Sequence, residues 1–258
     1  MFDLNTYLWG LTAILIAAVL TWLVSLARRD VSIVDSLWSL FFLLAAAVYA
    51  ATAPDPGPRT LLVLALVVVW AVRLSAYITW RNWGEGEDRR YQAIRRNNEP
   101  HFAIKSLYIV FGLQGLLAWL ISLPLLAAMV SGASINALDF IGVGLWAVGM
   151  AFEAGGDYQL ARFKARADNH GKVMDQGLWR YTRHPNYFGE FCIWWGFYAI
   201  ALAGGAWWAI VSPLVMTGLL LRVSGVALLE KDIGERRPAY REYITQTNAF
   251  FPGPPRKA

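Results

Sequence analysis

The most constraining feature of this sequence is a series of apolar runs, each long enough to cross a bilayer as a helix. A hydrocarbon core of about 30 Å takes about 20 helical residues to cross. Such runs lie at 4–27, 32–53, 60–80, 103–130, 138–160, 187–203 and 207–229. They predict an all-α polytopic membrane protein with seven transmembrane helices, which form one integral membrane domain over residues 1–258.

Composition supports this class. Hydrophobic residues make up 57% of the chain and charged residues 16%, well outside the averages of soluble domains. No basic residue precedes the first apolar run, so we expect it to be a membrane helix and not a signal peptide. Several Trp residues stand at the ends of runs, where they suit interfacial anchoring: Trp9, Trp80, Trp83, Trp207 and Trp208.

The distribution of positive charge predicts the orientation. Of 23 Lys and Arg, nearly all fall in alternate connections and in the tail after residue 229, whereas the other connections hold only Arg59. The positive-inside rule then places the N-terminus outside and the C-terminus in the cytoplasm. The basic face would attract anionic lipid or a phosphorylated ligand, although topology alone explains much of it. Nucleic acid is a poor candidate, because no soluble basic domain is present.

Polar side chains gather around two of the runs. The segment GLWRYTRHPNYFGE leads directly into the sixth run and ends with Asn186 and Glu190, one turn apart. A charge within a spanning helix costs roughly 2.5–3.5 kcal/mol, so Glu190 needs a partner or a ligand. In the fifth run, Glu153 and Asp157 share one helical face with Lys164. Two carboxylates one turn apart repel unless a cation or a donor lies between them, and we favour a ligand over an internal salt bridge.

The remaining charges are less directly interpretable. Asp35 stands in the first turn of the second run, where it suits either the helix dipole or a functional site. Arg73 and Tyr77 lie one turn apart in the third run, too deep for interfacial anchors. The loop WRNWGEGEDRRYQAIRRNNEPHF carries five Arg beside Tyr91 and fits a nucleotide lid better than an idle linker.

Several classes of chemistry are disfavoured by the sequence. The three histidines are far apart, so we expect no metal site, and no nucleophile elbow indicates a triad. A transporter or a structural membrane protein stays a rival class, since charged residues within helices could line a path. However, these charges cluster towards one face, which favours an enzyme that takes a ligand from the cytoplasm and an apolar substrate from the bilayer.

The segments SIVDSLW, EAGGDYQLARFK, GLWRYTRHPNYFGE and LLEKDIGERRPAYREY resemble the bacterial membrane family DUF1295, which is related to the C-terminal domain of steroid 5α-reductases. The resemblance covers nearly all of the chain. A similar RHP-x-Y, followed by a distal acidic pair, occurs in isoprenylcysteine carboxyl methyltransferases, which use S-adenosylmethionine. Here Glu230 is followed by Lys231, so that acidic pair is missing.

This resemblance implies a reductase in the bacterial inner membrane that binds NADPH in a cytoplasm-facing cavity and reduces a carbon–carbon double bond in a steroid enone or enoyl-like lipid. The alternative is a membrane methyltransferase. The residues it implies for cofactor binding are Arg89, Tyr91, Glu153, Asp157, Lys164, Lys172, Asn186, Glu190 and Arg222.

The chain departs from the steroid enzymes at several positions. They have Asn at the position of Glu153 and Arg at those of Lys164 and Lys172. Their ketone-polarising Tyr corresponds to Trp70, which cannot act as that acid, and their Gln–Glu pair has no clear counterpart. Asp35, Arg73 and Tyr77 are therefore the candidates for the acid or hydrogen-bond donor to a substrate carbonyl.

Overall fold

A computed structural model describes residues 2–53, 56–223, 225–231 and 233–256 of the chain, and these are helical with no strand among them. Six helical segments are long and apolar enough to cross a membrane by length and composition: Leu4–Arg28, Ile33–Thr52, Pro58–Asn82, Phe102–Ile121, Ala137–Lys164 and Trp207–Glu235. This confirms an all-α membrane protein. The expected run 187–203 is also helical, as α9 (Pro185–Ala203), but it is not among the six because polar Asn186 and Glu190 lie in its first turns.

The chain divides into two compact units, which we describe separately. Unit 1 comprises Met1–Ile135 and Ala201–Ala209, and unit 2 comprises Asn136–Ile200 and Ile210–Ala258. Unit 1 contains α1 (Leu4–Arg28), α2 (Ile33–Thr52), α3 (Pro58–Asn82), α4 (Arg89–Asn98), α5 (Phe102–Ser106), a π-helix (Leu107–Gly112), α6 (Leu113–Ile121) and α7 (Leu123–Met129).

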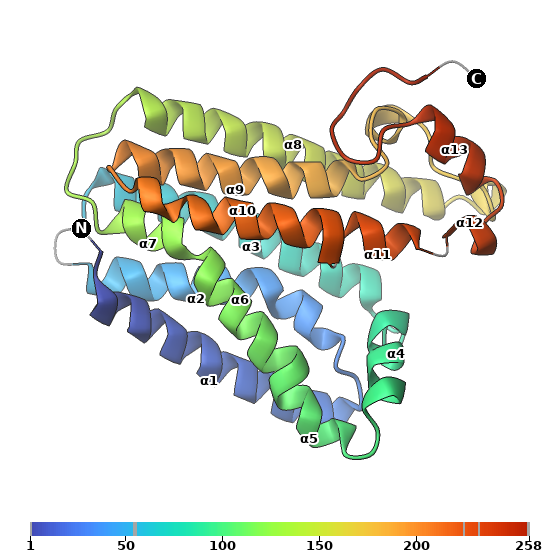
Figure 1. The fold of residues 1–258 in the computed structure, drawn as a ribbon, viewed down its shortest axis with the longest axis horizontal. Helices are drawn as coiled ribbons and strands as arrows, with labels where there is room; N and C mark the ends of the chain where they lie inside the picture. The colour runs from blue at the N-terminus through green and yellow to red at the C-terminus, as the bar shows by residue number, and fades with distance from the viewer. Residues whose placement is uncertain (1, 54–55, 224, 232, 257–258) are drawn as a thin grey trace. The chain divides into compact units, whose positions relative to one another are not determined.

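In unit 1, α2 packs between α1 and α3, and α6 and α7 cover this layer (Figure 1). Its core is aromatic, with Phe41, Phe42, Tyr49 and Trp70 almost completely buried. Asp3 caps the first turn of α1 by accepting the backbone N–H groups of Asn5 and Thr6. Because the apolar surface of this unit is large, the charged groups that remain inside it must each be paired.

The expected helix over 103–130 is interrupted, which corrects the sequence prediction. A π-helix follows α5, and the chain breaks at Ser122 between α6 and α7. Pro124 cannot donate a backbone hydrogen bond, so it occupies the first turn of α7. The Ser122 hydroxyl donates to the carbonyl of Trp119 and contacts the Tyr49 hydroxyl at 2.8 Å, which satisfies polar groups at the break.

Arg59, the exception in the positive-charge pattern, is buried in unit 1 with 1% of its surface exposed. Its guanidinium donates to the carbonyl oxygens of Ala133 and Ser134, both at 2.8 Å, and to the Ser131 hydroxyl at 3.3 Å. Arg59 therefore holds the connection after α7 in place, because its guanidinium donates hydrogen bonds to that connection.

Unit 2 is built on two long helices, α8 (Ala137–Lys164) and α9. Asn136 and Asp139 form a capping box at the start of α8. The expected single helix over 207–229 is also interrupted, and residue 224 lies outside the described residues. The segments there are a 3₁₀ turn (Trp207–Ile210), α10 (Val211–Gly218), a π-helix (Leu219–Val223) and α11 (Val226–Glu230). Two short helices close the unit, α12 (Ile233–Arg236) and α13 (Tyr240–Gln246).

Glycines allow the backbones of α8 and α9 to touch. Gly142 and Gly149 lie seven residues apart on α8, about two turns, and so face the same side. A Cβ on Gly142 would lie 2.7 Å from the carbonyl oxygen of Gly196, and one on Gly149 would lie 2.5 Å from that of Gly189. Only glycine fits at such distances. This contact sets the register of α8 against α9 and carries their polar ends together.

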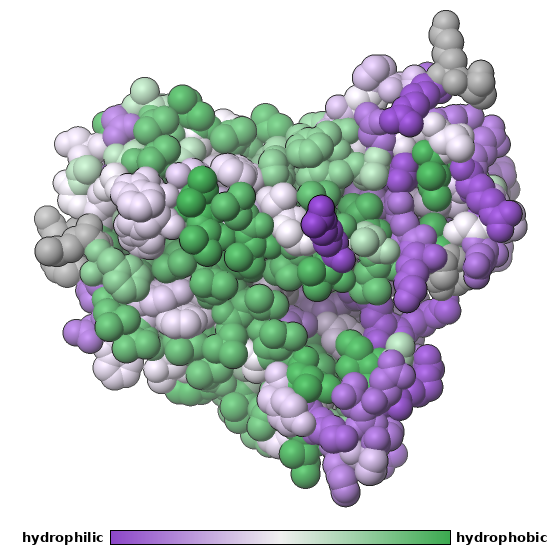
Figure 2. Space-filling model, in the orientation of Figure 1, coloured by the Kyte–Doolittle hydropathy of each residue, from purple (hydrophilic) through white to green (hydrophobic). Residues whose placement is uncertain are grey.

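Hydrophilic residues gather at one end of each unit, as Figure 2 shows: over α4 in unit 1, and over α12 and α13 in unit 2. The helices elsewhere present mainly hydrophobic residues. Four of the five Trp residues expected as interfacial anchors are exposed: Trp9, Trp80, Trp83 and Trp207. Each unit therefore has the polar end and apolar body that a membrane protein requires.

The glycine contact can be tested within one helix. Gly149→Ala should lower the thermal unfolding midpoint of the detergent-solubilised protein, because overpacking costs about 1–3 kcal/mol. Gly144→Ala is the matched control, since Gly144 is exposed on the same helix and has no atom within 4 Å of an added Cβ. It should leave the midpoint unchanged or raise it slightly. Equal midpoints for the two variants would contradict the contact.

Candidate functional site

The first candidate site lies in unit 2, where α8 and α9 bring four polar side chains together. Glu153 and Asp157 on α8 are 2% and 5% exposed. Asn186 on α9 directs its amide nitrogen towards the Asp157 carboxylate at 3.5 Å, and Glu190 follows one turn later. Gly189 allows this approach, because a Cβ there would lie 2.5 Å from the backbone nitrogen of Glu153. We call these four residues, Glu153, Asp157, Asn186 and Glu190, the acidic group.

The cations that the sequence predicts beside the acidic group lie on the surface of unit 2. Lys164 is the last residue of α8, Lys172 lies in the connection that follows, and Arg222 lies in the π-helix after α10. All three side chains are exposed.

A second cluster in unit 2 joins residues that the sequence analysis did not connect with one another. Arg183 and His184, just before α9, are 6% and 5% exposed and meet Glu230 at the end of α11. Both carboxylate oxygens of Glu230 accept from Arg183 at 2.7 Å, and the His184 ring contacts the same carboxylate at 2.9 Å. We call these three residues the Arg–His–Glu cluster.

This cluster also anchors the C-terminal segment. Arg183 donates from its side chain to the carbonyl oxygens of Ile244 and Thr247, and from its backbone to that of Asn248. Burial alone would lower the pKa of Arg183, but the hydrogen bonds to Glu230 and the charge of that carboxylate outweigh it and raise the pKa. Arg183 therefore stays charged and holds α9, α11 and the tail in one arrangement.

Unit 1 contains its own polar network, centred on Asp35 at the start of α2. One carboxylate oxygen accepts from the Arg90 guanidinium at 2.6 Å, and the other accepts from the Tyr91 hydroxyl at 2.5 Å. The Tyr91 oxygen in turn accepts from the side-chain amide of Gln114 on α6 at 2.9 Å. The Asp35 network thus joins α2, α4 and α6.

The charges of this network stabilise one another. Burial, together with the charge of Asp35 and the hydrogen bond to it, raises the pKa of Tyr91 well above its ordinary value. Burial works against the charge of Arg90, but the carboxylates of Asp35 and Asp88 outweigh it and raise the pKa of the guanidinium. At neutral pH, Tyr91 is therefore a neutral phenol and Arg90 a cation.

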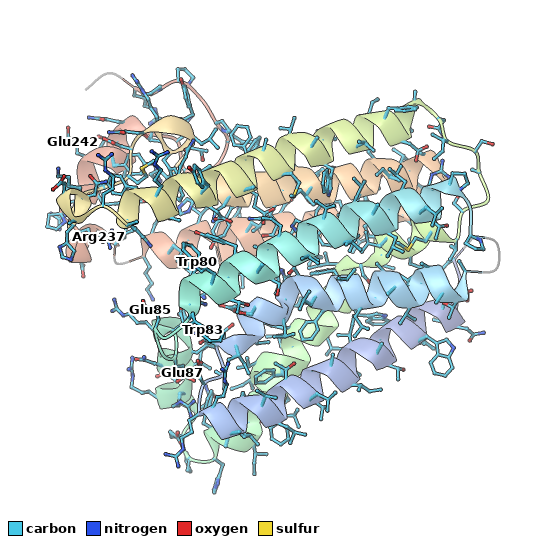
Figure 3. All side chains as sticks on the ribbon, turned by 180° about the vertical axis from the view of Figure 1, so that it is seen from behind. Trp80, Trp83, Glu85, Glu87, Arg237 and Glu242 are labelled. Atoms are coloured by element: carbon cyan, nitrogen blue, oxygen red, sulfur yellow. The ribbon has the colours of Figure 1, made fainter. Side chains whose placement is uncertain are left out.

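The loop expected as a lid forms a helix, α4, with internal ion pairs. Trp80, Trp83, Glu85 and Glu87 follow one another along the end of α3 and its connection to α4 (Figure 3). Glu87 accepts from Arg95 at 2.7 Å and from the backbone nitrogen of Val31 at 3.0 Å. Arg89, the first residue of α4, is exposed and directed away from this core. Arg90 and Arg95 thus form ion pairs within the protein, with Asp35 and Glu87 respectively.

The other two catalytic candidates lie together on α3. Arg73 and Tyr77 are both half-buried and one turn apart. The Tyr77 ring lies 5.8 Å from the guanidinium of Arg81 and 6.0 Å from the ring of Trp80. Trp70 is completely buried in the core of unit 1 and packs edge-on against Phe42.

The chain belongs to the family described as "Protein of unknown function (DUF1295)", whose pattern matches residues 21–247. It is also similar to an uncharacterized protein of Schizosaccharomyces pombe, with 28% identity over 97% of this chain and 81% of the yeast protein. No solved structure matches the chain. The family membership that the motifs predicted is confirmed. Because the similar protein is from a yeast, the expected bacterial inner membrane has no support from these relatives.

The Arg–His–Glu cluster can be tested by removing its negative charge. Glu230→Gln leaves the buried Arg183 cation without its counter-charge, and breaking such a pair costs about 3 kcal/mol or more. We expect a clear drop in the thermal unfolding midpoint. Glu235→Gln, a charge loss at an exposed position of the same segment, should change stability by less than about 0.5 kcal/mol. Similar midpoints for both variants would show that the cluster does not hold the unit.

The Asp35 network predicts that the Tyr91 hydroxyl holds α4 in place. Tyr91→Phe removes the group that links Asp35 to Gln114, so we expect trypsin to cleave within α4 several times faster than in the wild-type protein. Tyr108→Phe is the matched control, since Tyr108 is 60% exposed in the same unit. Equal cleavage rates in both variants and the wild type would contradict the role of Tyr91.

Proposed function

We propose that this protein is an NADPH-dependent reductase of a carbon–carbon double bond in a steroid enone or enoyl-like lipid. The observation that carries the proposal is the acidic group, in which buried carboxylates and an amide gather between two helices of an apolar unit. Ionisable side chains within membrane helices commonly mark functional sites, so their concentration here favours a polar ligand. Membership of DUF1295 and the family's resemblance to steroid 5α-reductases point to a dinucleotide.

The chemistry of these side chains fits the uncharged parts of that cofactor. Carboxylate oxygens accept hydrogen bonds from ribose hydroxyls, and the Asn186 amide can pair with the nicotinamide carboxamide. Phosphates require cations instead, and Lys164, Lys172 and Arg222 are the exposed candidates for them in unit 2. The cofactor supplies the hydride, while the chain contributes orientation and exclusion of water.

The Asp35 network narrows the choice of proton donor. Both carboxylate oxygens of Asp35 already accept hydrogen bonds, one from Arg90 and one from Tyr91, so we assign it no role as proton donor. The Tyr91 proton is already donated to Asp35. We therefore assign the acid or donor role to Tyr77, with Arg73 one turn away as a second donor to the substrate carbonyl. In this proposal Asp35 positions α4 and takes no part in proton transfer.

The proposal includes seven membrane-spanning helices, with α9 as the seventh. It places the N-terminus outside and the C-terminus in the cytoplasm.

The alternative, an S-adenosylmethionine-dependent methyltransferase, depends on RHPNY and a free acidic group after it. Glu230 is the nearest acidic residue of that pattern, and both its oxygens accept from Arg183. Reduction is therefore the better-supported function.

NADPH binding to the detergent-solubilised protein tests the proposal through cofactor fluorescence. We expect saturable binding, weakened about tenfold or more in Asn186→Ala and in Glu190→Gln, because a hydrogen bond from a charged group contributes about 1.5–3 kcal/mol. Glu242→Gln, an exposed charge on α13, is the matched control and should bind normally. The proposal fails if the wild type does not bind, or if S-adenosylmethionine saturates the protein instead.

A further inference from the structure

A polar pocket opens on unit 2, and none of the four residues of the acidic group lines it. It has a volume of about 490 Å³ and lies between the segment before α9 and the C-terminal tail. Residues Asp175, Gln176 and Arg180 line one side, and Gln246, Thr247 and Arg256 line the other. Its size falls in the range of small-molecule sites, roughly 300–1,000 Å³.

The walls of this pocket are tied to each other and to α8. The Tyr243 hydroxyl donates to the carbonyl oxygen of Trp179, and the Trp179 indole donates to that of Gly156 at 3.0 Å. The backbone nitrogen of Gly253 donates to the carbonyl oxygen of Tyr181 at 3.0 Å, and the backbone nitrogen of Arg256 donates to the carbonyl oxygen of Gln246 at 2.8 Å. These hydrogen bonds join the C-terminal segment to the segment before α9, and that segment to α8.

The lining carries a net positive charge. Arg180 and Arg256 are both exposed and face one carboxylate, that of Asp175. Within the described residues the Arg180 guanidinium makes no ion pair, and the Arg256 guanidinium donates only to the Asn248 side chain, at 3.3 Å. In contrast, Arg183 a few residues away is saturated by Glu230. Two guanidinium groups with unused donors, flanked by Gln amides, match the oxygens of a phosphate.

We propose that this pocket binds a phosphate-bearing polar ligand through Arg180 and Arg256. The ligand is either a soluble phosphorylated molecule or the headgroup of an anionic lipid, since both present the same phosphate oxygens. This site is distinct from the acidic group, whose carboxylates repel phosphate. The inference holds whether or not the protein is a reductase.

The experiment uses the full-length protein and two probes. Inorganic pyrophosphate is titrated into detergent-solubilised protein by calorimetry at low salt, and native mass spectrometry counts phosphatidylglycerol retained from nanodiscs that also contain phosphatidylcholine. We expect at least one probe to bind, with the double variant Arg180→Gln and Arg256→Gln weakening it about tenfold or more. Loss of pyrophosphate binding identifies a soluble ligand, and loss of retained phosphatidylglycerol identifies a lipid.

Two controls keep the proposal falsifiable. Arg162→Gln removes an exposed Arg of the same unit, and it should change neither measurement. Asn186→Ala alters the acidic group and should also leave both unchanged. The inference is overturned if the wild type binds neither probe, if the double variant binds as well as the wild type, or if either control weakens binding equally.

Discussion

The contact between the backbones of α8 and α9 is the constraint on which the architecture of unit 2 depends. Gly149 and Gly189 lie so close that any side chain on either would overlap the opposite helix. In a bilayer, where lipid competes with protein for apolar surface, such close packing is a main source of helix association. The same approach places Gly189 against the backbone of Glu153, so the polar ends of the two helices meet. The acidic group is a direct consequence of helix packing.

The charged side chains fall into two groups, those with partners inside the protein and those exposed to solvent. Arg183 with Glu230, Asp35 with Arg90, and Arg59 with backbone carbonyls are internally satisfied, as buried ions in an apolar protein must be. These groups stabilise connections between helices, and their charges already interact with partners inside the protein. In contrast, Lys164, Lys172 and Arg180 are exposed. Burial and exposure thus separate the charged residues that hold helices together from those that are in contact with solvent.

Much of this could be predicted from the sequence, because helix formation in lipid depends on local apolar runs and the DUF1295 segments are continuous motifs. The spacing of Glu153, Asp157, Asn186 and Glu190 also follows from helical periodicity. What could not be predicted is long-range pairing. Arg183 and Glu230 are 47 residues apart, and no local pattern indicates that they meet. The break at Ser122 was indicated by Pro124, but neither π-helix has a sequence signature that we recognised.

The acidic group constrains any ligand more strongly than family membership does. Buried carboxylates at Glu153 and Asp157 would repel a phosphate placed against them, whereas hydroxyl and amide groups can donate hydrogen bonds to carboxylate oxygens. For the proposed reductase, we therefore infer that ribose or nicotinamide would lie at the acidic group and that the phosphates would lie against exposed cations of unit 2. Under this proposal, the charges of unit 2 favour a ligand with a donor-rich end and an anionic end over one that is anionic throughout.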